Sequence, residues 1–144
     1  MIRRGLTSAL CSLTIVLFGH SAAANVAATP IILFGFGSSE IDSAGRVIIE
    51  EIAAKLRTKG DVSILVVGHA DRAGPLLNNI ELSRRRAEAV RDSLIAAGVP
   101  ERFVATRALG EEQLAVPTGD GIREAANRRV EILIEGGGWA VDQP

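Results

Sequence analysis

Apolar positions along the chain alternate between compact runs, which are typical of strands, and stripes with helical spacing. The runs over residues 31–36 (IILFGF) and 62–67 (VSILVV) predict two buried strands. Between them, apolar residues recur every three or four positions, which predicts a helix over residues 43–59, with Ser43 as its cap and Gly60 ending it. The first half of the pattern is therefore strand, helix, strand.

The second half repeats this alternation and then adds a strand. The pattern predicts a loop over 68–75, a longer helix from Asn78 or Asn79 to Gly98, a strand over 102–109, a polar loop over 110–121, a helical turn over 122–127 and a final strand over 129–135. Alternating elements of this kind favour an α/β fold with helices packed on one mixed sheet. We expect one domain over 31–135, followed by a flexible tail over 136–144.

The N-terminal segment has the composition of an export signal. Two arginines precede a short apolar run, and small residues of the A-x-A type follow, ending at Ala24. This predicts a secretory signal over 1–24, cleavage before Asn25, a lead-in over 25–30 and a periplasmic mature protein. An uncleaved membrane anchor is the alternative, although the apolar run is short for a bilayer span. Cys11 lies inside this run and is interpreted as part of the signal, not as a lipid attachment site.

Composition and charge exclude several classes of function. A net charge of -1 and few aromatic residues argue against nucleic-acid binding. The segment GFGSS lacks the third glycine of a dinucleotide loop, since Glu40 occupies that position. No nucleophile, base and orienting group occur together, and His69 has no second histidine in the expected domain. We therefore expect neither catalysis, nor a metal, nor a cofactor.

One arginine of the second helix falls on its apolar stripe. Leu82, Arg86 and Val90 are four residues apart, so they share a face, whereas Arg84 and Arg85 point largely to water. A guanidinium there needs a partner, because an unpaired buried charge is costly. Either Arg86 forms a structural ion pair, or it binds the carboxylate of a ligand.

The expected partner of Arg86 is Asp71, in the loop GHADRAG that follows the second strand. Ligands of α/β sheets favour loops at the carboxyl ends of strands. Asp71 either forms a turn with its own loop or binds a ligand. Side by side, an Asp and an Arg would bind a group that carries both an ammonium and a carboxylate.

Five motifs in order resemble the OmpA-like family, the peptidoglycan-binding domain of OmpA C-terminal halves, Pal lipoproteins and MotB-type stators. They are ILFGFGSSEID, VVGHADRAG, NIELSRRRAEAVRDSLIAAGVP, RALGEEQ and REAANRRVEILI, which together span about residues 31–135. The resemblance implies a βαβαββ two-layer α/β sandwich. It also implies non-covalent binding of the peptide stem of peptidoglycan and a place in the cell envelope, either periplasmic or associated with the outer membrane.

The resemblance also implies roles for individual residues. Asp71 and Arg86 would hold the ammonium and the carboxylate of meso-diaminopimelate. Further positions of the family's pocket correspond to Asn79, Leu82, Ala87 and Val90, and Arg128 would be a second cation near the ligand's carboxylates. On this basis, Asp71→Ala or Arg86→Ala is expected to abolish wall binding and leave the fold intact, and Arg85→Ala is expected to matter little.

Two positions depart from the family pattern. Ala70 replaces the usual Thr before the Asp, and Gly37 replaces an Asp or Asn after the first strand. The backbone N–H groups of Gly37 and Ser38 are expected to receive a ligand carboxylate instead. If these changes leave the pocket degenerate, the domain would be an interaction module for envelope proteins. The sequence does not indicate an oligomeric state.

Overall fold

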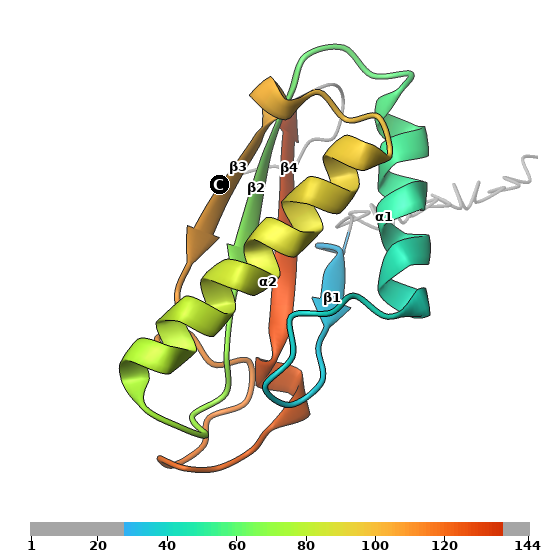
Figure 1. The fold of residues 1–144 in the computed structure, drawn as a ribbon. Helices are drawn as coiled ribbons and strands as arrows, with labels where there is room; N and C mark the ends of the chain where they lie inside the picture. Colours follow the sequence, from blue (N-terminus) through green and yellow to red (C-terminus); the bar gives the residue numbers. More distant parts are fainter. Residues whose placement is uncertain (1–27, 137–144) are drawn as a thin grey trace, which may run out of the picture.

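The computed structural model describes residues 28–136, which form two α-helices, two short 3-10 helices, labelled η, and four strands (Figure 1). The elements follow the order β1 (Ile31–Leu33), α1 (Ser43–Leu56), β2 (Val62–Gly68), α2 (Leu76–Ala96), η1 (Glu101–Phe103), β3 (Val104–Ala108), η2 (Ala125–Asn127) and β4 (Arg129–Gly136). The predicted βαβαββ order is therefore confirmed. The predicted signal over 1–24, its cleavage site and residues 137–144 of the predicted tail lie outside the described residues.

The four strands form one mixed sheet in the order β1-β4-β2-β3. β4 is antiparallel to both of its neighbours, β1 and β2, whereas β2 and β3 run parallel. α2 crosses the sheet and α1 lies beside it on the same side (Figure 1). This is the predicted α/β arrangement of helices packed on one mixed sheet.

The core lies between the two helices and one face of the sheet. Alternate residues of each strand point into it, and the best-buried ones are Ile32, Ile64, Val66, Val130, Ile132 and Ile134, which pack with Ile49, Ile52, Val90 and Leu94 of the helices. The opposite positions of the edge strand, Ile31 and Leu33, are 43% and 53% exposed. The prediction of a wholly buried first strand was therefore wrong, because helices cover only one face of the sheet.

Several element ends differ from the prediction for local reasons. β1 ends at Leu33 because Gly35 and Ser38 close a turn, in which the Ser38 N–H donates to the Gly35 carbonyl. Asp42, not Ser43, caps α1, since its carboxylate accepts a bond of 2.8 Å from the Gly45 N–H. α2 begins at Leu76, directly after Pro75, instead of at Asn78. Gly136, expected in the tail, belongs to β4.

Candidate functional site

A cavity of about 400 Å³ lies where the end of β2, the start of α2 and the loop after β1 meet. Its lining residues are Phe36, Gly37, Asp71, Ala73, Gly74, Pro75, Asn78, Asn79, Glu81, Leu82 and Arg85. Four predicted site residues therefore line one cavity, namely Gly37, Asp71, Asn79 and Leu82. Ser38, Arg86, Ala87, Val90 and Arg128 were also predicted for the site but do not line it.

Close packing of α2 on β2 positions the cavity. Gly68 ends β2, and a Cβ atom there would lie only 2.0 Å from the Ser83 carbonyl oxygen. Only glycine therefore lets the helix approach this closely. The hydroxyl of Ser83 also accepts a bond of 2.9 Å from the Gly110 N–H, which ties the segment after β3 to the same helix turn. The residues after Gly68, including Asp71, are thereby held against α2.

Asp71 is a nearly buried acid in the wall of the cavity, with 4% of its surface exposed. Its Oδ2 lies 3.2 Å from Nη1 of Arg128 and accepts a bond of 3.2 Å from the Glu124 N–H. Its Oδ1 accepts only a long bond of 3.4 Å from the Ala73 N–H. A carboxylate oxygen has two acceptor sites, so Oδ1 retains capacity for a further donor.

Arg86 is fully buried behind this cavity and is held by three backbone carbonyls. Its Nε donates to Ser38 at 2.8 Å, Nη1 to His69 at 3.0 Å and Nη2 to Gly35 at 3.1 Å. Burial lowers the pKa of Arg86 to about 10; the Asp71 carboxylate opposes this change, and the charges of Arg128 and Arg85 add to it. Arg86 therefore stays charged at neutral pH.

The expected direct pairing of Asp71 with Arg86 was wrong. Among the described residues, Arg128 is the ion-pair partner of Asp71, and the hydrogen bonds of Arg86 go to carbonyls instead. The physical reason is the burial of Arg86. Carbonyls of the loops after β1 and β2 surround its guanidinium and accept its hydrogen bonds. Arg86 thus joins α2 to the two loops that frame the cavity and influences Asp71 through its charge.

Four other predicted positions lie in the core, in the cavity lining or in the loop after β1. Ala87 and Val90 have no exposed surface and belong to the core, so they support the helix behind the cavity instead of lining it. Asn79 is 3% exposed, and its Nδ2 donates to Glu111 at 2.7 Å. The Ser38 N–H already donates to the Gly35 carbonyl. This N–H group is therefore not free to bind a ligand carboxylate, and the expectation that it would do so was wrong.

The long segment between β3 and β4 contributes contacts that the sequence did not predict. Arg72 pairs with Asp120 at 2.6 Å and donates to the Thr118 carbonyl at 3.1 Å. Arg123 stacks over Phe36, with its guanidinium carbon 3.7 Å from the ring centroid. These pairs are distant in sequence, and the position of Arg72 directly after Asp71 was the only local sign of them. The segment therefore closes one side of the site.

Asn127 holds this segment in place. It is fully buried, its Nδ2 donates to the Val116 carbonyl at 2.8 Å, and its Oδ1 accepts from the Val116 N–H at 2.9 Å. The side chain thus pairs with both backbone groups of Val116, as a neighbouring strand would. Arg128, the cation that pairs with Asp71, follows directly and also donates to the Phe34 carbonyl at 3.0 Å.

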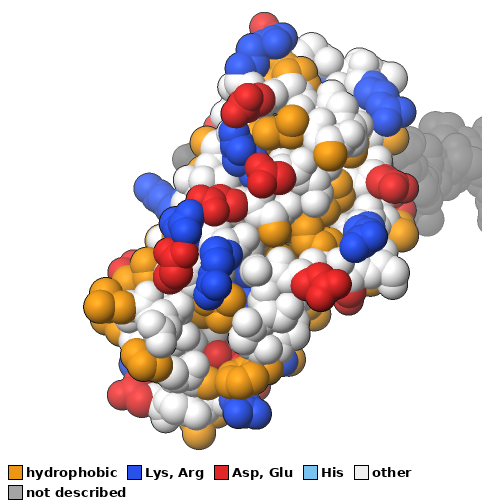
Figure 2. All heavy atoms as spheres, in the orientation of Figure 1, with side chains coloured by type: hydrophobic (Ala, Val, Ile, Leu, Met, Phe, Trp, Pro, Cys, Tyr) orange, Lys and Arg blue, Asp and Glu red, His pale blue; other side chains and the backbone are white. Residues whose placement is uncertain are grey.

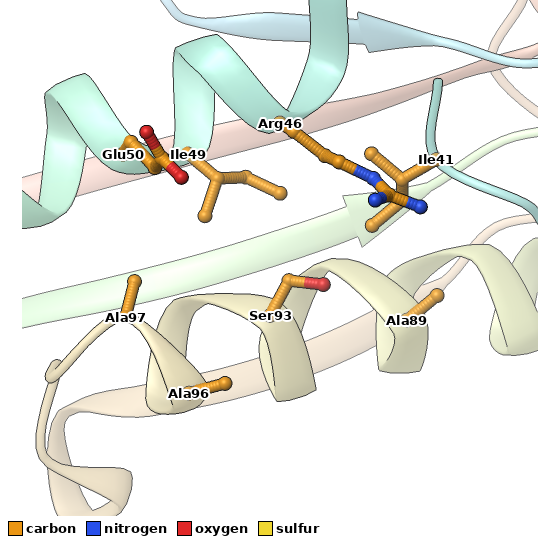
Figure 3. Close-up of a pocket in the computed structure, with 8 residues that line it drawn as sticks. All are labelled: Ile41, Arg46, Ile49, Glu50, Ala89, Ser93, Ala96 and Ala97. Carbon is orange, nitrogen blue, oxygen red and sulfur yellow. The ribbon is translucent and has the colours of Figure 1, made fainter. Parts of the chain in front are cut away.

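A larger cavity of about 500 Å³ lies between α1 and α2 (Figure 3). Arg46 and Glu50 of α1 lie opposite small side chains of α2 there, namely Ala89, Ser93 and Ala96, and of Ala97 directly after it. It contains none of the predicted site residues and no buried charge. The candidate site is therefore the smaller cavity, where a desolvated carboxylate is held in place.

Two further classes of site have no support in the described part of the chain. Within residues 28–136, no three or more His, Cys, Asp or Glu side chains are grouped so that they could hold a metal ion. No helix in the same range has the length and apolar character to cross a bilayer. The chemistry of the cavity is that of charge-assisted hydrogen bonding.

Comparison with known sequences gives a consistent family. Residues 33–128 match the OmpA family. Outer membrane protein A of Yersinia pseudotuberculosis serotype I is 35% identical over 126 residues, which cover 78% of this chain and 35% of that protein. An outer membrane protein of Gluconacetobacter diazotrophicus is 35% identical over 114 residues, which cover 75% and 30%. The chain thus spans about a third of the length of these relatives.

Solved structures share the fold. The peptidoglycan-associated lipoprotein from Burkholderia pseudomallei aligns with a TM-score of 0.68 and 28% identity, covering 73% of this chain and 89% of that chain. The periplasmic domain of Helicobacter pylori MotB aligns with a TM-score of 0.61 and 26% identity, covering 73% and 70%. The predicted two-layer α/β fold is confirmed by these likenesses.

Proposed function

Because the chain belongs to the OmpA family, we propose that it binds peptidoglycan non-covalently and thereby attaches to the bacterial cell wall. The name of the similar Burkholderia protein, a peptidoglycan-associated lipoprotein, supports this proposal. The bound group is the meso-diaminopimelate of the peptide stem. Its free end carries an ammonium and a carboxylate on the same carbon, and both suit the charges around the cavity.

The observation that carries this proposal is the held carboxylate of Asp71. Its Oδ2 accepts bonds from Arg128 and the Glu124 N–H, whereas Oδ1 accepts only the long bond from the Ala73 N–H, and the residue lines the cavity. An ammonium bound to Oδ1 would form a charge-assisted bond shielded from water. Most of the surface of the acid is already removed from water in the free protein, so binding adds little to that cost.

Arg86 has a positioning role in this proposal. Its three bonds hold the loop after β1 and the loop after β2 against α2. Its charge and that of Arg128 both act on Asp71, and these two cations favour a ligand that brings a carboxylate as well as an ammonium. The expectation that Arg86→Ala leaves the fold intact is therefore replaced by an expected loss of stability.

The location follows from the same proposal. The relatives named above are outer membrane proteins, and the predicted signal would export this chain to the periplasm. There the domain would bind the wall directly. The uncleaved anchor stays an alternative for the N-terminal segment, and mass spectrometry of the purified protein's N-terminus decides between them.

The rival proposal of an envelope interaction module rests on the two departures from the family pattern. Ala70 is 1% exposed and does not line the cavity, so the missing hydroxyl removes no lining group. Gly37 does line it, with a φ of +63° that favours glycine. The placement of Ala70 thus supports a functional pocket, whereas the change at Gly37 does remove a side chain from the cavity wall.

Sedimentation with purified sacculi tests the proposal. The protein should pellet with diaminopimelate-containing sacculi, and a soluble stem peptide ending in meso-diaminopimelate should release it. Failure to pellet would reject wall binding. Pelleting that the stem peptide does not reverse would reject the peptide stem as the ligand.

A further inference from the structure

A cavity of about 210 Å³ lies at the end of the core where both helices end and β2 begins. It is separate from the candidate site described above, because it lies at the start of β2, whereas Asp71 follows the end of that strand. Its floor consists of buried core residues, namely Ala53, Leu56, Val62 and Val99. A large apolar side chain would therefore fill this cavity favourably.

We propose that this cavity is the docking site for residues 137–144 of the same chain, with the indole of Trp139 as the anchor. These residues, GGWAVDQP, follow directly after β4 and lie outside the described range. They include the only tryptophan of the chain. The inference goes beyond the proposed function and does not rest on it. It replaces the expectation of a flexible tail.

The register of the sheet brings the start of this segment to the cavity. Gly136, the last residue of β4, is the antiparallel partner of Val62, which lines the cavity. Antiparallel partners have Cα atoms about 5 Å apart, and three residues of chain span at most about 10 Å. Trp139, three residues beyond Gly136, is therefore tethered within reach of the cavity.

The backbone at Gly136 departs from the extended conformation of the strand. Its φ is +87°, in the left-handed region that favours glycine. A Cβ atom there would lie 3.0 Å from the Asp61 carbonyl oxygen, so the chain passes close to the segment between α1 and β2. Gly60 of that segment lines the cavity. The chain thus leaves the sheet beside one wall of the cavity.

The rim of the cavity has the charge that suits this segment. Arg57 and Lys59 line the cavity and are exposed, and neither has an ion-pair partner among residues 28–136. Arg102 stacks on Phe103, another lining residue, with its guanidinium carbon 4.4 Å from the ring centroid. At this end of the molecule, uppermost in the view, Figure 2 shows basic side chains with hydrophobic ones between them. Cations of this kind attract both an indole face and a carboxylate such as that of Asp142.

Covalent attachment favours this segment over an occupant from another molecule. A segment joined to its site by a few residues has an effective concentration in the millimolar range. A second copy of the chain or another protein would have to reach a similar concentration to displace it. The short tether therefore makes residues 137–144 the expected occupant.

Tryptophan fluorescence tests the proposal, because the chain contains no tyrosine and the emission reports on Trp139 alone. The wild type should emit at a shorter wavelength than the urea-unfolded protein and should be quenched less by acrylamide. Gly60→Leu adds bulk at the cavity, where a Cβ atom would meet nothing within 4 Å, so the variant should fold. Its emission should shift towards that of the unfolded protein. Gly119→Leu is the matched control, since that glycine also has open space around it but does not line the cavity.

Thermal unfolding gives a second measure of the same contact. Trp139→Ala should lower the melting temperature by about 5 °C, because a large aromatic side chain loses its buried surface. The same substitution made in Gly60→Leu should have little further effect, since the cavity is already filled. Additive losses would show that the two positions do not interact.

Each outcome of the fluorescence experiment bears on the proposal. Wild-type emission equal to that of the unfolded protein would mean that the indole is exposed, and docking would be rejected. A shielded indole that Gly60→Leu leaves unchanged would lie elsewhere, and this cavity would be rejected as its site. Shielding that disappears on dilution would mean that the segment docks on a second copy, which would overturn docking within one chain.

Discussion

The two cavities that flank α2 differ in how their charged groups are held. In the larger one, between the helices, Arg46 and Glu50 are exposed and face small side chains (Figure 3). In the smaller one, Asp71 is 4% exposed and is held by donors from Glu124 and Arg128, which flank η2, and from its own loop. The volume of a cavity therefore does not identify a site here. A buried charge held in one orientation does, because its desolvation must be offset by specific contacts.

The largest expected effect concerns the scaffold of the smaller cavity. Arg86→Ala should lower the free energy of unfolding by about 3 kcal/mol, because it removes a fully buried side chain and its bonds to one buried and two partly buried carbonyls. Urea denaturation measures the loss. Arg84→Ala is the control and should change stability by less than about 0.5 kcal/mol, as an exposed ion pair contributes little. Equal losses for both variants would show that Arg86 has no special structural role.

The next largest effect is a loss of ligand affinity, which should follow a change in the smaller cavity but not in the larger one. Asp71→Asn keeps the shape of the side chain but removes its charge, so affinity for the diaminopimelate stem peptide should fall about a hundredfold. Glu50→Gln makes the same change in the larger cavity and should leave affinity unchanged. Titration calorimetry measures both. Loss of affinity in Glu50→Gln with retention in Asp71→Asn would move the site to the groove between the helices.

A smaller loss of stability is expected when the hydrogen bonds between Asn127 and the segment after β3 are removed. Asn127→Ala truncates a fully buried side chain and removes its two bonds with the backbone N–H and carbonyl of Val116. We expect a loss of stability of about 2 kcal/mol. Thermal unfolding monitors it. Asn78→Ala, an exposed amide on α2, is the control, and a loss of similar size there would contradict the fastening role of Asn127.

The smallest effect is a pH dependence that arises next to the site. Burial lowers the pKa of His69; the positive charge of Arg129 lowers it further, and Glu131 opposes the change. The unfolded chain therefore binds more protons than the folded one just below the ordinary histidine pKa, and stability should decline as the pH falls from about 7.5 through about 6. His69→Gln should flatten this slope in melting experiments. A slope that survives the substitution would assign the effect to another group.

The hydrophobic pattern predicted most of the fold because short-range periodicity decides helix and strand. The order of elements and the apolar stripe of α2 followed from spacing alone, and the five motifs were sufficient to indicate the family. Element ends were less well predicted, as at Leu33, where a turn closed by Gly35 and Ser38 ends β1 before the apolar run ends. The exposure of Ile31 and Leu33 was also missed, because the sheet face that the helices leave uncovered is decided only when the sheet assembles.

Partnerships within the site were a different matter. The sequence indicated that Asp71 and Arg86 are unusual, since a charge on an apolar face requires compensation. It did not determine that Arg128 pairs with Asp71 or that carbonyls satisfy Arg86, because these contacts join segments up to 57 residues apart. Among Arg84, Arg85 and Arg86, sequence periodicity identified which one is buried. Only the tertiary structure decided that Arg85, and not Arg84, lines the cavity, since this depends on where the loops after β1 and β2 pack against the helix.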